Sequence, residues 1–173
     1  MLLKYFGAAL IIASTYFYGN SISSFYRNRV GQLEELLLGL EMFHTEINYG
    51  LTPLPLAFMN IGAKLREPVG AIFLGAAREM QKSRGLSARR CWQNAWEDSS
   101  GALAFSAREM KLLERLGLAW GKGDKNDQLR QTALIQELLR QALREAREEL
   151  QKNDKMWKYL GLLGGTTLVI FLL

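Results

Sequence analysis

The sequence predicts an all-α protein, a six-helix antiparallel bundle flanked by an N-terminal and a C-terminal transmembrane helix. Three observations lead to this prediction. Apolar residues recur three and four positions apart through the middle of the chain, without alternating runs rich in Val, Ile and Thr. Short connections containing Gly or Pro separate these periodic segments, as in antiparallel helix bundles. Uncharged, largely apolar runs stand at both ends of the chain.

Composition limits the class of protein. The 173 residues suit one domain with additional segments, and 49% hydrophobic against 23% charged residues excludes a disordered chain. One cysteine and one histidine exclude a disulfide within the chain and a Cys/His zinc site. The net charge of +5 comes from basic residues interspersed with acidic ones, so no nucleic-acid-binding surface is predicted.

Residues 1–26 are predicted to form the first transmembrane segment. The 22 residues from Tyr5 to Tyr26 carry no formal charge, and a helix needs ~20 such residues to cross the hydrocarbon layer. The second half of the run is polar. A cleaved secretory signal is the alternative, but Arg27 and Arg29 directly after the run oppose translocation.

Residues 156–173 are predicted to form a second transmembrane or membrane-embedded segment. The uncharged run from Tyr159 to Leu173 is short for a full crossing, so a half-inserted tail stays an alternative. Gly161 and Gly165 are spaced for close helix approach in lipid, which suggests self-association through the membrane helices. Basic residues flank both segments on their inner sides, and this places the domain of residues 27–155 in the cytoplasm and both termini on the other side.

The first two bundle helices are predicted around a glycine and two prolines. An apolar stripe ends near Tyr49, and Gly50 suits a left-handed helix stop. Thr52 is then predicted to cap a second helix, with Pro53 at its first position and Pro55 in its first turn. The stripe comprises Val30, Leu33, Leu37, Leu40, Phe43 or His44, and Ile47, and the second helix buries Leu54, Phe58, Ile61 and Leu65.

Three helices are predicted next. One runs from Pro68 past Met80 and breaks at Arg84-Gly85. Another is capped by Ser87 and ends at Gly101. The third begins with the capping box of Ser106 and Glu109. Their predicted inward residues are Val69, Ile72, Phe73 and Ala76, then Cys91, Trp92, Ala95 and Trp96, then Met110, Leu113, Leu116 and Trp120.

The last helix is predicted to follow a tight turn that ends at Asp124. It runs from about Asp127 to about Asn153, or on into the membrane. Its predicted buried side comprises Leu134, Leu138, Leu139, Ala142, Leu143, Ala146 and Leu150.

Candidate reactive groups are few, and we predict no catalytic, cofactor-binding or metal-binding residue and no enzyme activity. His44 lies on the edge of an apolar stripe and is interpreted as a packed, hydrogen-bonded side chain. Cys91 is interpreted as a core residue. The run Gly117-x-x-x-Gly121-x-Gly123 lacks the strand and the Lys-Ser/Thr ending of a phosphate-binding loop.

Several motifs resemble one known family. The run EINYGLTPLPLA at residues 46–57 is the most specific, and MLLKYFGA with IAST opens the chain. Weaker matches are AWE at residues 95–97 and the spacing of Leu116-Gly117, Gly121, Asp124 and Gln128, and the close reads KYLGLLGG. Together they resemble the stage III sporulation protein AB family of endospore-forming bacteria, in order and over essentially the whole chain. Lys122-Gly123 departs from the pattern of that turn.

The resemblance implies a non-enzymatic component of the mother-cell membrane around the forespore. It implies a place in a secretion-like complex that joins the two cells, and partners that are a cytoplasmic secretion-type ATPase and membrane channel subunits. It also implies that the helical domain is similar to the inner-membrane platform protein of type II secretion and type IV pilus systems. A membrane-anchored adaptor that binds a soluble signalling protein is the alternative function.

Partner contacts are expected at two turns, because turns project from a rigid bundle. The candidate residues are Tyr49, Gly50, Pro53 and Pro55 at the first turn, and Trp120, Asp124 and Gln128 at the second. The alternative reading is that Gly50, Pro53 and Gly117 only cap and turn helices.

Overall fold

A computed structural model gives the fold. It describes the backbone of residues 2–48, 52–82, 85–121 and 125–172. Side chains are described over the same ranges except at residues 2–13, 15–23, 121, 125, 154–155 and 157–172. Within these ranges the chain is helical and contains no strand, so the all-α prediction is confirmed.

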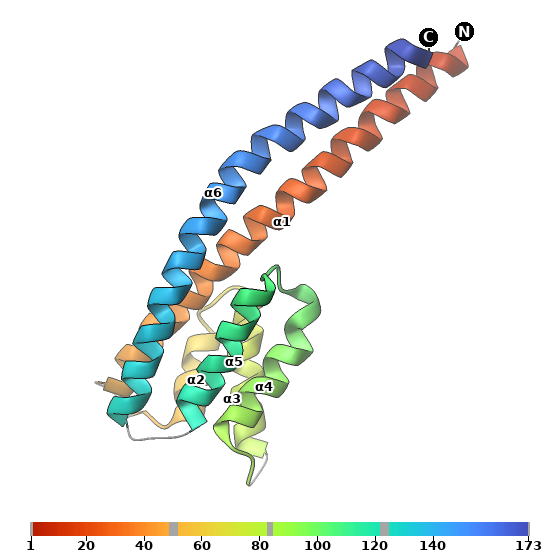
Figure 1. Ribbon diagram of the computed structural model, residues 1–173. Coiled ribbons are helices and arrows are strands. Elements are labelled where there is room, and N and C mark those ends of the chain that lie inside the picture. The colour runs from red at the N-terminus through yellow and green to blue at the C-terminus, as the bar shows by residue number, and fades with distance from the viewer. Residues whose placement is uncertain (1, 49–51, 83–84, 122–124, 173) are drawn as a thin grey trace. The chain divides into compact units, whose positions relative to one another are not determined.

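Six α-helices and one 3₁₀ turn make up the described backbone (Figure 1). They are α1 (Leu2–Asn48), α2 (Leu54–Gly62), α3 (Val69–Lys82), α4 (Ala88–Ser99), η1 (Ser100–Ala102), α5 (Ala107–Gly121) and α6 (Lys125–Leu172). The first predicted membrane segment and the first bundle helix form one continuous helix, since no Gly or Pro interrupts the chain from Ser21 to Val30. At the other end α6 likewise continues through residues 152–158 without a break.

The chain divides into two compact units. The first unit combines residues 1–30 with residues 145–173, and the second comprises residues 31–144. The domain boundaries predicted from the sequence, after residues 26 and 155, stay predictions.

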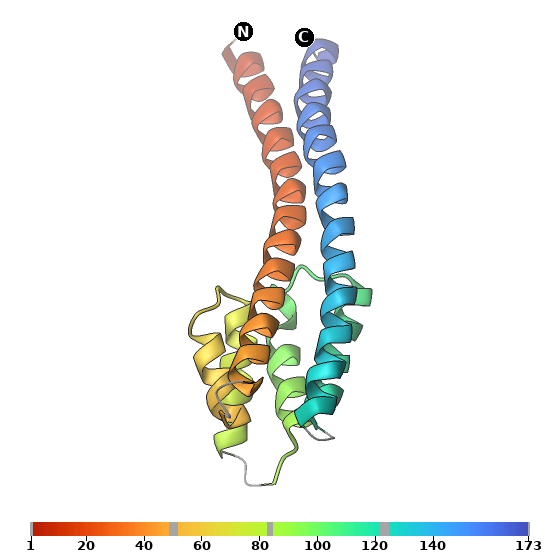
Figure 2. The ribbon, with the colours of Figure 1, turned by 90° about the vertical axis from the view of Figure 1, so that its left-hand side faces the viewer.

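The first unit pairs the N-terminal part of α1 with the C-terminal part of α6, which run side by side in two views (Figures 1 and 2). Arg29 Nη1 lies 2.5 Å from Glu149 Oε2 and joins the two helices. No helix contains, among the residues that the structure describes, an 18-residue window apolar enough to cross a membrane. Most side chains of the predicted segments 1–26 and 156–173 lie outside the described residues, so their transmembrane character stays a prediction.

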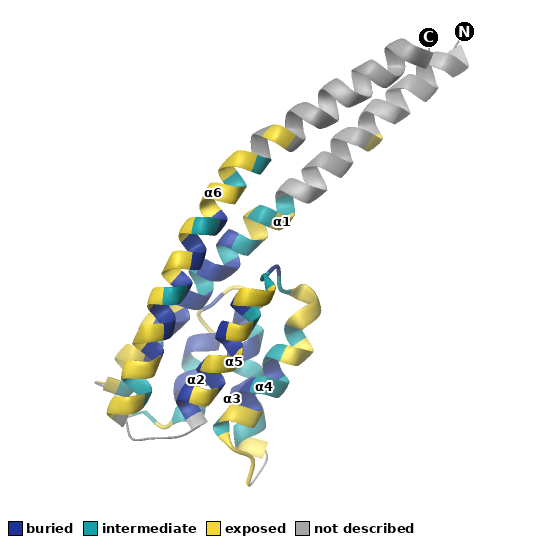
Figure 3. Cartoon of the chain, viewed as in Figure 1, coloured by how far each residue is buried: buried dark blue, intermediate teal, exposed yellow. Residues whose placement is uncertain are grey.

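The second unit holds the buried core, which lies where its helices face one another (Figure 3). On α1 the predicted stripe is confirmed at Leu33, Leu40 and Phe43, and Leu36 joins it; all four are 0% exposed. Most inward residues predicted on the shorter helices are also buried, with Ile72, Phe73, Trp92 and Leu113 at 0% exposure. The exceptions are half-buried: Leu54, Met80, Trp96 and Met110.

Close backbone approach lets α2 and α3 pack tightly. A Cβ atom added at Gly70 would lie 2.6 Å from the carbonyl oxygen of Leu65 and 2.9 Å from that of Gly62. Both distances are shorter than van der Waals contact, so only a residue without a side chain fits at this position.

Two of the three predicted N-caps are confirmed. Ser87 Oγ accepts a 3.4 Å hydrogen bond from the N–H of Arg90. At α5, the Ser106 N–H donates to Glu109 Oε2 at 2.6 Å while the Glu109 N–H donates to Ser106 Oγ at 3.4 Å. This reciprocal pair is a capping box.

The predicted Thr52 cap is wrong. Pro53 occupies the N-cap position of α2, which receives no side-chain hydrogen bond, and Pro55 lies in the first turn. The Thr52 hydroxyl instead donates to Glu46 Oε2 at 2.9 Å. Thr52 thus lies one residue before the N-cap, and its bond to Glu46 holds the hydroxyl there.

The predicted orientations of two side chains are also wrong. Leu134 is 63% exposed, because the buried row of α6 runs one residue further round the helix through Thr132, Ile135, Leu139 and Ala142. His44 is exposed, since its neighbour Phe43 takes the inward position on α1.

Candidate functional site

A cluster of five aromatic side chains forms the rigid centre of the second unit. Trp92 and Trp120 are central to it, with ring centroids 4.7 Å apart in an edge-to-face arrangement. Phe58 lies 4.9 Å from Trp120, and Phe73 lies 5.1 Å from Trp92. Phe43 completes the cluster at 5.0 Å from Trp120. Edge-to-face pairs stabilise beyond the area that they bury, so this cluster fixes the positions of the helices that contribute to it.

The indole N–H group of each central tryptophan donates a hydrogen bond. Trp92 Nε1 donates a 2.7 Å hydrogen bond to the carbonyl oxygen of Leu113. Trp120 Nε1 donates to Thr132 Oγ1 at 3.1 Å, and that hydroxyl donates to the carbonyl oxygen of Gln128 at 2.7 Å. Trp120 is 2% exposed. Trp120 is therefore a core residue. Its hydrogen bond to Thr132 helps to position the first turns of α6, which include Gln128.

Close contact with Trp92 explains Gly117. A Cβ atom added there would lie 2.9 Å from Trp92 Cδ1. This residue gives the indole its space, which supports the packing interpretation of the glycine over a ligand-binding one.

The other candidate partner residues differ in how far they reach the surface. Pro53 is exposed, Pro55 is half-buried, and Gln128 is half-buried. Tyr49, Gly50 and Asp124 lie outside the described residues. The structure joins Trp120 to Gln128 through Thr132, and the described contacts do not link either of them to Pro53 or Pro55.

The candidate reactive groups are not assembled into a reactive site. Cys91 is 0% exposed, and burial raises the pKa of its thiol, helped by the negative charge of Glu79. A raised pKa keeps the thiol protonated and a poor nucleophile. Among the described residues no group of three or more His, Cys, Asp and Glu side chains is placed to hold a metal ion.

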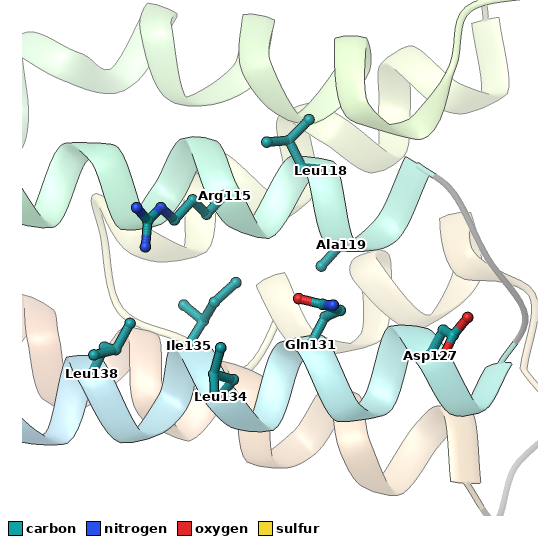
Figure 4. A pocket seen from close by; sticks show the side chains of 8 residues that line it. All are labelled: Arg115, Leu118, Ala119, Asp127, Gln131, Leu134, Ile135 and Leu138. Atoms are coloured by element: carbon teal, nitrogen blue, oxygen red, sulfur yellow. The ribbon is translucent and has the colours of Figure 1, made fainter.

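A groove between α5 and α6 was missed by the sequence reasoning. It has a volume of about 560 Å³ and lies within the second unit (Figure 4). We call it the α5/α6 groove, and its lining residues are Arg115, Leu118, Ala119, Asp127, Gln131, Leu134, Ile135 and Leu138. No motif in the sequence marks this groove, because it depends on how α5 and α6 pack against each other.

A smaller cleft of about 250 Å³ lies along the outer side of α1. It is lined by Glu41, Met42, Thr45, Glu46 and Lys64. Glu41 also lies 3.4 Å from Arg140 on α6, an exposed ion pair of small energetic weight.

The described residues define an all-α helical bundle, a class of fold that by itself implies no particular chemistry. Comparison with known proteins gives a specific family. The model of the family described as stage III sporulation protein AB matches residues 4–173, and the chain belongs to this family.

A relative and a solved structure are similar to it. Stage III sporulation protein AB of Bacillus subtilis (strain 168) is 29% identical over 172 residues, which cover 99% of this chain and 100% of that protein. A solved structure of stage III sporulation protein AB has a TM-score of 0.68 at 25% identity, and the match covers 72% of this chain and 97% of that one. The resemblance that the sequence motifs indicated is thus confirmed.

Proposed function

We propose that this protein is a non-enzymatic membrane platform in the complex that joins the mother cell to the forespore during endospore formation. In this role it couples a cytoplasmic secretion-type ATPase to membrane channel subunits. The observation that carries the proposal is the family match over residues 4–173, which includes both predicted membrane segments as well as the helical bundle.

Membrane attachment is part of the proposal and is supported by the sequence. The uncharged runs at residues 5–26 and 159–173 are flanked on their inner sides by Arg27, Arg29 and three lysines. This distribution favours two membrane anchors with the bundle on the mother-cell cytoplasmic face and the termini on the other side. Two anchors would raise the effective concentration of the bundle near membrane partners.

Partner contact is assigned in this proposal to the two turns beside the aromatic cluster. Pro53 offers an exposed apolar surface at the start of α2, and Gln128 stands on a helix turn that Trp120 and Thr132 hold in place. A rigidly held surface loses little conformational entropy on binding, which favours Gln128 as a contact residue.

Site-specific photo-crosslinking in sporulating cells tests this proposal. A photoreactive residue at Pro53 or Gln128 is expected to capture the ATPase or a channel subunit. The same residue at the exposed Arg78 on α3 is the matched control and is expected to capture neither. Capture of a lone soluble signalling protein instead would favour the alternative function, a membrane-anchored adaptor. Capture profiles identical at all three positions would contradict the proposed contact surface.

A further inference from the structure

The connection between α3 and α4 concentrates the net charge of the chain. The nine residues from Lys82 to Arg90 include four basic and no acidic side chains, a net charge of +4 where the whole chain carries +5. No nine-residue stretch that lies apart from this one exceeds +2. Basic residues elsewhere are interspersed with acidic ones, so this connection is the most strongly charged segment of the sequence.

The basic side chains that the structure describes here have no counter-charge. Lys82 is the last residue of α3, and Arg89 and Arg90 stand in the first turn of α4, at the same end of this helix pair (Figure 1). All three are exposed, and none forms an ion pair with another residue that the structure describes. By contrast, Arg66 and Arg140 each pair with a carboxylate of α1.

The carboxylate nearest to this connection in the sequence, Glu79, is engaged elsewhere. Its Oε1 accepts a 2.6 Å hydrogen bond from Asn94 Nδ2, and its charge acts on the buried thiol of Cys91. The first turn of α4 contains no acidic residue, although the helix dipole favours one there. Two arginines at this place add to the positive charge of the helix start, an arrangement that favours an anionic partner over the stability of the fold.

One exposed apolar side chain lies among these charges. Leu86 is 45% exposed and directly precedes Ser87, the N-cap of α4. It is the one exposed large hydrophobic side chain among the described residues from 69 to 99. We call the exposed charged and apolar side chains of this connection the α3/α4 patch: Lys82, Leu86, Arg89 and Arg90. Arg84 lies outside the described residues and is not part of it.

We propose that the α3/α4 patch binds an acidic segment of another protein, with an apolar residue of that segment against Leu86. The arginines favour this partner, because the guanidinium fork matches a carboxylate with two parallel hydrogen bonds. The proposal does not rest on the platform function proposed above, and it concerns a different surface from Pro53 and Gln128.

Three other occupants fit the patch less well. Single-stranded nucleic acid is held by aromatic as well as basic side chains, and the aromatic residue nearest to the patch in the sequence, Trp92, is 0% exposed. A surface that enters a membrane interface presents several apolar side chains, whereas this patch has Leu86 alone. A second copy of this chain is nearly neutral outside residues 82–90, where 17 acidic residues face 18 of the 22 basic ones.

Fluorescence anisotropy with the full chain in detergent tests the recognition of charge. The probe is a fluorescein-labelled helical peptide of Ala and Leu with Glu residues one turn apart, and a peptide with Gln at every Glu position is its control. Arg89→Gln/Arg90→Gln is expected to weaken binding of the Glu peptide by about tenfold, because two charge contacts are lost. Lys111→Gln/Arg115→Gln, which removes two exposed charges from α5, is the matched variant and is expected to change binding by about twofold or less.

Photo-crosslinking from position 86 in sporulating cells tests the class of partner. We expect a crosslink that mass spectrometry maps to an acidic segment of another protein, and we expect Arg89→Gln/Arg90→Gln to remove it while Lys111→Gln/Arg115→Gln leaves it. Three outcomes would overturn the proposal. They are equal affinity for the Gln peptide, equal effects of the two double variants, and the lack of a charge-dependent crosslink to an acidic protein segment, whether lipid, nucleic acid, a second copy or nothing is captured instead.

Discussion

Trp92 and Trp96 lie four residues apart on α4 and differ in how their indole nitrogens are bonded. Trp92 is fully buried, and its Nε1 donates to the Leu113 carbonyl oxygen at 2.7 Å. Trp96 is half-buried, and its buried Nε1 has no acceptor among the described residues. The two residues therefore contribute differently to stability although the sequence assigns both to the same inward face.

Replacing each tryptophan by phenylalanine is expected to separate these contributions. Trp92→Phe loses a buried hydrogen bond to the Leu113 carbonyl oxygen, which costs about 0.5–1.5 kcal/mol. Trp96→Phe removes an unsatisfied donor and is expected to be neutral or stabilising. Urea unfolding of the two purified variants measures the difference. Equal loss of stability would contradict the hydrogen-bonding pattern.

The contacts of Glu35 with Arg66 make a contribution to stability that depends on pH. Burial raises the pKa of this carboxyl, but two hydrogen bonds from Arg66 and its positive charge outweigh burial and hold the pKa below its ordinary value. The Arg66 N–H donates at 3.0 Å and its Nε at 2.6 Å. Because the folded pKa is lowered, the stabilisation is present above the unfolded pKa of about 4.3 and is lost as the pH falls through the folded pKa.

Glu35→Gln is accordingly expected to destabilise the protein at neutral pH and to matter less in acid. The wild-type and variant unfolding free energies are expected to converge as the pH falls below about 4. Glu137→Gln is the control, because the exposed Glu137–Arg140 pair at 3.5 Å contributes about 0.5 kcal/mol or less. A gap between wild type and Glu35→Gln that stays constant with pH would show that the Arg66 contacts do not depend on the charge.

The packing of α2 against α3 is an interaction between elements that depends on two glycines, Gly62 and Gly70. Gly70→Ala would push a methyl group to 2.6 Å from the Leu65 carbonyl oxygen, so the helices must separate. Overpacking of this kind costs about 1–3 kcal/mol. At Gly31 on α1 nothing lies within 4 Å of an added Cβ, and Gly31→Ala is expected to stabilise by about 1 kcal/mol because alanine favours the helix. Thermal unfolding of both variants checks the opposite signs.

The elements that the sequence predicts best are those with a strong local signal. Helical periodicity, the Ser87 cap and the Ser106–Glu109 capping box each depend on neighbouring residues, and the structure bears them out. The Thr52 prediction fails because its hydroxyl finds Glu46, which lies on another element. The Leu134 prediction fails because a leucine at the edge of a helical stripe satisfies the spacing without facing the core.

In the candidate site, too, the features that depend on packing between distant segments could not be predicted from the sequence. The sequence singles out Trp120 as a contact residue, but its place in the aromatic cluster depends on Phe43 and Phe58, which come from distant segments. The α5/α6 groove depends on how two helices pack and leaves no motif in the sequence. Pro53 and Gln128 reach the surface to different degrees, and this also follows from packing rather than from sequence spacing.

The whole molecule, under the proposed function, is a helical bundle anchored at both ends and presented to partners on one side of a membrane. Family membership over residues 4–173 and the basic residues inside both uncharged runs support this arrangement. The arrangement makes a definite prediction for the side on which each part of the chain is accessible.

Cysteine accessibility in spheroplasts that express the full chain tests this central claim most directly. In a Cys91→Ala background, Lys82→Cys on α3 is expected to resist a membrane-impermeant maleimide until the membrane is permeabilised, whereas Leu2→Cys at the N-terminus is expected to react at once. Labelling of Lys82→Cys in intact spheroplasts, or recovery of the chain in the fraction free of membranes, would contradict the anchored arrangement.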